Sequence, residues 1–166
     1  ITGGSSGVGK SLVEYLSERF TVVTVARRID RLKSLFGGND SVYTYELDLA
    51  EVSQISDQIE LLISEHGPIL YLINNAAINQ SGSIENVSPD AMETSMRINT
   101  IAPIEVLQTL LPSMKRHNFG RVINVTSGAP LDIPEGAIPY SSSKAALNVA
   151  TVTAARELSE YDIKIN

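Results

Sequence analysis

The sequence predicts an α/β fold in which a doubly wound parallel sheet is covered by helices on both faces, giving three layers. Short runs rich in β-branched residues recur along the chain, and the segments between them have helical spacing of apolar residues. The expected strands are Thr21–Ala26, Val42–Leu47, Ile69–Asn74 and Arg121–Thr126. Strands that are apolar almost throughout and alternate with helices are typical of a buried parallel sheet.

The expected helices follow from the positions of their apolar residues. One face is shared by Val8, Leu12, Val13 and Leu16, and another by Ile55, Ile59, Leu62 and Ile63. A long helix is expected to begin at Ser88-Pro89, because serine is a good N-cap and proline suits the first helical position. It carries Met92, Met96, Leu107, Leu111 and Met114 and is expected to end near Asn118–Gly120. A last helix should follow Pro139 and run through Leu158.

The two ends of the sequence resemble incomplete strands. Ile1–Gly3 has the composition of a strand end that leads into a glycine loop, and Asp162–Asn166 begins another β-like run. A central strand left out would cost two rows of ladder hydrogen bonds. We therefore expect residues 1–166 to form a single domain that belongs to a longer chain, with an incomplete first strand and a missing C-terminal part.

Composition and charge narrow the class of protein. The 166 residues include 13 Lys and Arg against 19 Asp and Glu, a formal charge of −6, and they include no cysteine. A net acidic chain is a poor candidate for nucleic-acid binding, and disulfides and cysteine-based metal sites are excluded. No apolar run approaches the ~18–20 residues that span a membrane, and no signal peptide is present. These features predict a soluble, cytoplasmic protein without a metal site.

A glycine-rich segment lies where a strand should pass into a helix. Thr2–Gly9 reads TGGSSGVG, and glycines at such a turn allow positive φ and a close approach of the backbone to a ligand. The free N–H groups at the start of the following helix favour a pyrophosphate. Glycine-rich turns of this kind also occur without a ligand, so the loop alone leaves both possibilities open.

Five motifs in order give the sequence a family resemblance. The loop Thr2–Gly9 resembles the TGxxxGxG cofactor loop of short-chain dehydrogenases/reductases, and Asn74–Ala77 (NNAA) resembles their NNAG element. Asn99 lies in the long expected helix, Ser127 follows an expected strand, and Tyr140–Lys144 forms a YxxxK pair 13 residues after that serine. The resemblance covers the whole sequence and implies a Rossmann-like NAD(P)-binding domain over residues 1–166.

The resemblance implies a catalytic role for four side chains. Tyr140 would exchange a proton with the substrate oxygen, and Lys144, four residues on and on the same helix face, would favour its phenolate. Ser127 would orient the substrate oxygen, and Asn99 would hold a water that completes a proton relay. The alternatives are a surface tyrosine and lysine on an ordinary helix, a turn-capping serine, and an exposed or capping asparagine.

The resemblance also implies a set of cofactor-binding residues. These are Gly3, Ser5, Ser6, Gly7, Val8, Gly9, Asn75, Ala76 and Ala77, together with Tyr140 and Lys144, whose amine would bind the nicotinamide ribose. Ala77 replaces the glycine that is usual in NNAG.

The residues after two further strands bear on the choice of cofactor. Arg27 and Arg28 follow the first full strand, where sites specific for NAD place an acid, and guanidinium groups suit the 2′-phosphate of NADP. Arg27 is expected to make the main contact with this phosphate, with Arg28 adding to the local positive field. NADP(H) is therefore favoured over NAD(H), although the pair could also be merely solvated. Some NADP-dependent relatives carry a basic residue in the glycine loop, where this sequence has Ser5-Ser6. Asp48-Leu49 resembles an adenine-contacting element, although Asp48 could instead form a turn. Asp30 is expected on the next helix.

Together these features predict an oxidoreductase that transfers a hydride between NADP(H) and a small carbonyl or alcohol substrate. The alternative is a non-catalytic dinucleotide-binding sensor or scaffold on the same fold. The resemblance further implies a homodimer or homotetramer formed through the long helices at 89–117 and 140–160. Alanines at 145, 146, 150, 154 and 155 would permit a close approach of two helices. The identity of the substrate is not encoded in these residues.

Overall fold

The computed structural model describes residues 1–166 and contains a parallel β-sheet built from five strands. The strands are β1 (Val22–Ala26), β2 (Val42–Glu46), β3 (Tyr71–Asn74), β4 (Gly120–Asn124) and β5 (Ile163–Ile165). β1 pairs with β2, and β4 lies between β3 and β5, with every pair parallel. The four predicted strands are all present, with ends shifted by one or two residues.

Ile1–Gly3 joins the two groups of strands. The Val25 amide donates to the Ile1 carbonyl at 3.0 Å, and the Gly3 amide donates to the Val25 carbonyl at 2.8 Å. On its other side, the Thr2 amide donates to the Ile73 carbonyl at 3.0 Å. This extended segment lies between β1 and β3, so the order across the sheet is β2, β1, Ile1–Gly3, β3, β4, β5. The predicted doubly wound order is confirmed.

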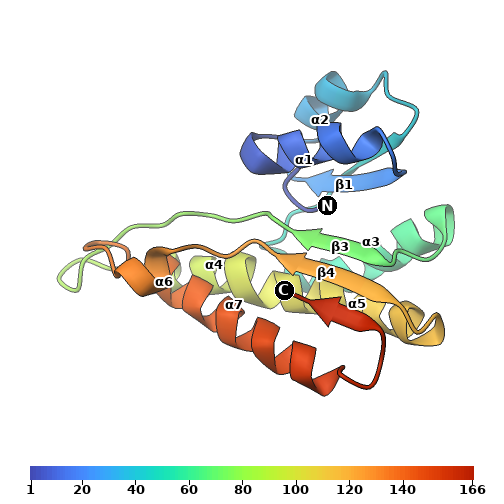
Figure 1. The fold of residues 1–166 in the computed structure, drawn as a ribbon. Helices are drawn as coiled ribbons and strands as arrows, with labels where there is room; N and C mark the ends of the chain where they lie inside the picture. The colour runs from blue at the N-terminus through green and yellow to red at the C-terminus, as the bar shows by residue number, and fades with distance from the viewer.

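Helices cover both faces of the sheet, as Figure 1 shows. One face carries α1 (Gly7–Ser17) and α2 (Ile29–Phe36), and the other carries α3 (Val52–His66), α5 (Ala102–Arg116) and α7 (Ile138–Glu157). Two buried clusters result, one of 5 residues beneath α1 and α2 and one of 16 residues on the opposite side. Burial of both faces fits the apolar sequence of β1, whereas Tyr71 of β3 and Ile123 of β4 are exposed on the face opposite to α5 and α7. None of the helices combines the length and apolar character needed to cross a membrane.

The long helix predicted after Ser88 differs in detail. Its start is confirmed, because Ser88 Oγ accepts a hydrogen bond from the Ala91 amide at 3.1 Å and Pro89 follows at the first turn. The helix then divides into α4 (Pro89–Met96), a π-helical turn η1 (Arg97–Ile101) and α5. Hydrophobic spacing does not reveal a wider turn inside an otherwise regular pattern. A short helix α6 (Ala129–Asp132), which the sequence did not predict, precedes α7.

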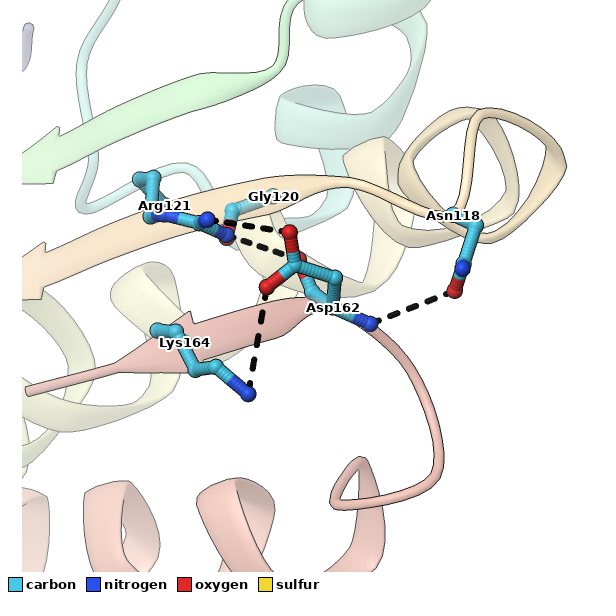
Figure 2. Close-up of polar contacts among 5 residues, drawn as sticks. All are labelled: Asn118, Gly120, Arg121, Asp162 and Lys164. Carbon is cyan, nitrogen blue, oxygen red and sulfur yellow. Dashed lines mark hydrogen bonds and ion pairs between the residues drawn. The ribbon is translucent and has the colours of Figure 1, made fainter.

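An ionic cluster fixes β5 against β4 at the end of the sheet remote from the glycine loop. Arg121 donates through Nη1 to the Asp162 carbonyl at 2.7 Å and through Nη2 to the Asp162 carboxylate at 3.0 Å (Figure 2). Lys164 Nζ lies 3.8 Å from the same carboxylate, and the Asp162 amide donates to Asn118 Oδ1. Arg121 holds the pKa of the Asp162 carboxyl below its ordinary value.

Candidate active site

A cleft of about 340 Å³ lies at the carboxyl ends of β1, β2 and β3, where the loops after these strands meet. Most residues predicted to bind a cofactor line it: Gly3, Ser5, Ser6, Val8, Gly9, Arg27, Arg28, Asp48, Leu49, Asn75, Ala76 and Ala77. Gly7 begins α1 with φ +54°, a conformation that favours glycine. Residues far apart in sequence are thus gathered at the edge of a parallel sheet where ligands commonly bind.

The glycine loop is fixed to the segment after β3 by hydrogen bonds from both sides. Thr2 Oγ1 accepts from the backbone amides of Asn75 and Ala76, each at 3.0 Å, and Asn75 Nδ2 donates to the Thr2 carbonyl at 3.0 Å. A side chain at Gly9 would collide with Asn75 Nδ2 and the Gly3 carbonyl oxygen. Gly9 is therefore required for this close approach rather than for conformational freedom alone.

The start of α1 leaves backbone donors available beside this loop. Ser6 is the N-cap residue, but its side chain makes no capping hydrogen bond to the helix. The first N–H groups of a helix have no partner within the helix, and their dipole favours an anion. The N-terminus of α1 and the glycine loop thus present backbone donors on the same side of the cleft.

Arg28 is the basic side chain that approaches the glycine loop. Its Nη2 lies 3.3 Å from both Ser5 Oγ and Ser6 Oγ. Arg27 lines the same cleft but makes no side-chain hydrogen bond or ion pair. Asp48 Oδ1 accepts from the Ala50 amide at 2.9 Å, so the aspartate forms a turn while also lining the cleft. The structure therefore places positive charge, from Arg28 foremost, beside the two loop serines.

Lys144 is almost completely buried beneath the loop that follows β4. Only 2% of its surface is exposed, and Nζ donates to the Val125 carbonyl at 2.7 Å. Burial lowers the pKa of the Lys144 amine, which makes proton release easier near neutral pH. Tyr140 lies one turn earlier on α7 and is half-buried. The alternative of an ordinary surface lysine is therefore excluded.

Ser127 follows the last residues of the β4 segment and keeps its hydroxyl hydrogen available. Ser127 Oγ accepts from the Ala129 amide at 3.1 Å, so it caps the turn that precedes α6, as the alternative role predicted. A hydroxyl that accepts one hydrogen bond can still donate another. The two roles considered for Ser127 are thus compatible with one another.

Asn99 is fully buried in the π-helical turn and connects three segments. Its Oδ1 accepts from the Ile78 amide at 2.8 Å, and Nδ2 donates to the Ile78 carbonyl and to Ser143 Oγ, each at 2.9 Å. An exposed or capping role is excluded. Because both amide hydrogens are used, any water bound to Asn99 must donate to one of its oxygens.

Sequence reasoning missed Ser143 and Thr100. Ser143 is fully buried, and Thr100 Oγ1 donates to its carbonyl at 2.8 Å. Both residues tie η1 to α7, next to Lys144. The only available signal was the position of Ser143, three residues after Tyr140 and therefore on the same side of the helix.

A second, larger cleft of about 400 Å³ lies between β1 and β3, but its chemistry is different. It is lined mainly by aliphatic and aromatic side chains, and Thr2 and Ile1 close one end. None of the four candidate catalytic residues and none of the predicted cofactor-binding residues line it. We therefore place the candidate cofactor site at the glycine-loop cleft. The four candidate catalytic residues, Asn99, Ser127, Tyr140 and Lys144, do not line that cleft either.

Comparison with known proteins identifies the family of this chain. A family model described as short chain dehydrogenase matches residues 1–166. An uncharacterized oxidoreductase of Staphylococcus epidermidis is 26% identical over 167 residues, which cover 99% of this chain and 73% of that protein. A short-chain dehydrogenase from Streptomyces avermitilis superposes with a TM-score of 0.93 at 28% identity, over 99% of this chain and 61% of that one.

A third relative was solved with a nucleotide bound. The short-chain dehydrogenase from Sphingobium yanoikuyae, in complex with NADPH, has a TM-score of 0.89 and 27% identity, over 100% of this chain and 67% of its own. The chain thus spans about three fifths to three quarters of the relatives compared. The match of the family model over every residue, together with the fold and the five motifs, shows that this chain belongs to the short-chain dehydrogenase family of oxidoreductases.

Proposed function

We propose that the chain binds NADP(H) in the glycine-loop cleft and reduces a carbonyl group, or oxidises the corresponding alcohol, of a small molecule. The nicotinamide would supply the hydride, and the protein would supply position and electrostatics. The family membership and the gathering of the predicted residues around one cleft support this proposal. The single observation that carries it is the burial of Lys144 one turn after Tyr140 on α7, with Nζ bound to the Val125 carbonyl two residues before Ser127.

The cleft fits a dinucleotide phosphate on three counts. The close approach at Gly9 leaves no room for a side chain, the first turn of α1 presents free backbone donors, and Arg28 lies at the rim. The Ser5 and Ser6 hydroxyls beside Arg28 are further hydrogen-bonding groups for phosphate oxygens. We assign the 2′-phosphate contact primarily to Arg28, with Arg27 adding to the local positive field. The NADPH bound to the Sphingobium relative supports the same choice.

Four side chains have separate roles in the proposed reaction. Tyr140 donates a proton to the carbonyl oxygen or takes one from the alcohol. Ser127 donates its free hydroxyl hydrogen to that oxygen and holds it in place. Lys144, with its pKa lowered by burial, favours the tyrosine phenolate by its charge and can pass on a proton. Asn99 fixes η1 against α7, so that the helix that carries Tyr140 and Lys144 is held in place.

The test is oxidation of NADPH, followed by absorbance, with a panel of activated ketones. We expect Tyr140→Phe to reduce the rate by about 100-fold or more, since proton transfer by a positioned group contributes ~10²–10⁴-fold, while NADPH binding is retained. Ser142→Ala is a matched control, because Ser142 lies two residues from Tyr140 on the exposed side of α7. Retained NADPH binding without turnover of any ketone in the wild type would favour the sensor or scaffold.

We further propose that the protein is a homodimer or homotetramer. The outer surface of α7 exposes Val149 and Val152, and Ile101 at the end of η1 and Ile104 in α5 are also exposed. A row of exposed β-branched side chains on two helices is typical of an interface. Sedimentation should therefore show a dimer or tetramer at micromolar concentration, and Val149→Glu should shift it toward monomer. A wild type that sediments only as a monomer would contradict this proposal.

A further inference from the structure

A chain of hydrogen bonds runs beneath the active site from α5 through β3 and β4 to α7. Asn74 Nδ2 donates to the Pro103 carbonyl at 3.3 Å and to Asn124 Oδ1 at 2.9 Å. Asn124 Nδ2 donates in turn to Thr151 Oγ1 at 2.8 Å, and the Thr151 hydroxyl donates to the Leu147 carbonyl at 2.7 Å. Side chains of two neighbouring strands thereby link the two helices that pack on this face of the sheet.

The direction of every hydrogen bond in this chain is fixed. Thr151 uses its one hydrogen for the Leu147 carbonyl and therefore accepts from Asn124. Asn124 then accepts from Asn74 through Oδ1. Asn74 donates both amide hydrogens, to Asn124 and to the Pro103 carbonyl, while its own buried Oδ1 has no hydrogen-bond partner. A flipped Asn74 would place that oxygen against two other oxygens.

The chain contacts α7 close to the anchor of Lys144. Thr151 lies seven residues, or two turns, after Lys144 and so faces the same side of the helix. Asn124 immediately precedes Val125, whose carbonyl accepts from Lys144 Nζ. The dipeptide Asn124-Val125 at the end of β4 thus holds α7 at two points, through the Asn124 side chain at Thr151 and through the Val125 carbonyl at Lys144.

We propose that Asn124 and Thr151 are positioning residues, which fix α7 along the sheet so that Lys144 Nζ stays on the Val125 carbonyl and Tyr140, one turn earlier on α7, keeps its place relative to Lys144. This inference rests on the proposed function of that site. The bond from Thr151 to Leu147 is an ordinary contact within a helix and does not locate α7. The bond from Asn124 joins α7 to the sheet and therefore determines its position along the strands.

The test compares Thr151→Val, which keeps the shape but removes the hydroxyl, with Thr151→Ser, which keeps the hydroxyl. Thr109→Val is the matched control, because Thr109 Oγ1 donates to the Glu105 carbonyl in α5 at 2.9 Å and has no partner on another element. We expect Thr151→Val to lower kcat about tenfold with little change in the affinity for NADPH, since small displacements of reacting groups cost large factors in rate. Thr151→Ser should restore most of the rate, and Thr109→Val should leave it unchanged.

A second readout needs neither cofactor nor turnover. Nuclear magnetic resonance of isotope-labelled lysine, with the Lys144 signal assigned by its loss in Lys144→Arg, follows the titration of the amine. In Thr151→Val the pKa of Lys144 should rise toward its ordinary value as the amine gains access to water, whereas Thr109→Val should leave it unchanged. A variant that only lowers stability would shift the melting temperature without moving this pKa.

The two hypotheses fail in different ways. If Tyr140→Phe abolishes turnover while Thr151→Val matches Thr109→Val in rate and in the Lys144 titration, the positioning role is wrong and the proposed function stands. If the wild type shows no NADPH-dependent turnover, the proposed function is wrong. In that case an unchanged Lys144 titration in Thr151→Val overturns the positioning role as well, and a shifted one shows that the chain still positions Lys144.

Discussion

Replacement of Arg28 by alanine should weaken cofactor binding while leaving the stability of the fold nearly unchanged. The guanidinium is exposed, and its contacts to the hydroxyls of Ser5 and Ser6 are both 3.3 Å long, beyond the usual range for strong hydrogen bonds. Removal of such contacts at an exposed position should change the free energy of unfolding by less than about 0.5 kcal/mol. A loss of NADPH affinity in Arg28→Ala can then be assigned to the cofactor contact itself.

The expected size of that loss follows from the charge of the 2′-phosphate. A charge-assisted pair of hydrogen bonds contributes ~1.5–3 kcal/mol, so Arg28→Ala should weaken NADPH binding about 10- to 100-fold. NADH lacks the phosphate and should bind with nearly unchanged affinity. Because the site is open to solvent, the preference for NADPH should also shrink as the salt concentration rises.

Paired titrations of NADPH and NADH against the wild type and two variants test this reasoning. Arg27→Ala is the control, since it removes the same charge from the neighbouring residue, which makes no contact with the loop serines. We expect a clearly smaller loss for Arg27→Ala than for Arg28→Ala. Equal affinities of the wild type for the two cofactors would refute the preference for NADP(H). A larger loss of NADPH affinity in Arg27→Ala than in Arg28→Ala would show that Arg27 makes the phosphate contact.

Three further predictions concern the loop, the sheet and the region before α7. Gly9→Ala forces a methyl group against Asn75 and should lower the free energy of unfolding by ~1–3 kcal/mol. It should also weaken cofactor binding, and thermal unfolding with and without NADPH measures both effects. Arg121 lowers the pKa of the Asp162 carboxyl, so the ion pair stabilises the fold above the ordinary aspartate pKa, and this stabilisation is lost as the pH falls through the lower pKa of the folded state. The free energy of unfolding of Asp162→Asn should therefore be lower than that of the wild type at neutral pH and equal to it in strong acid. Ile133 has φ 47° and a side chain that is 76% exposed. Ile133→Gly should therefore relieve backbone strain and raise the free energy of unfolding by about 1 kcal/mol or less. A lower melting temperature in this variant would contradict the prediction.

The strands and the glycine loop could be predicted because their signals are local. Runs of β-branched residues and the cap formed by Ser88-Pro89 are determined by neighbouring residues alone, and both lie where the sequence placed them. From the sequence we expected Arg27 to make the main phosphate contact, whereas Arg28 is the side chain that approaches the loop serines. Two adjacent side chains differ in direction only through the path of the backbone at the end of β1, which depends on how β1 packs.

The π-helical turn was missed for a more instructive reason. A regular helix with one buried face turns about 100° per residue, so three consecutive residues cannot all face the core. In η1, Ile98, Asn99 and Thr100 are all buried, because the wider turn brings Asn99 to Ile78 and Ser143 and brings Thr100 to the Ser143 carbonyl. Two polar side chains could be buried only because partners from the loop after β3 and from α7 satisfy them. The local helix geometry at Asn99 is therefore a consequence of tertiary contacts with the helix that carries Tyr140 and Lys144. The spacing of apolar residues along the sequence cannot indicate those contacts.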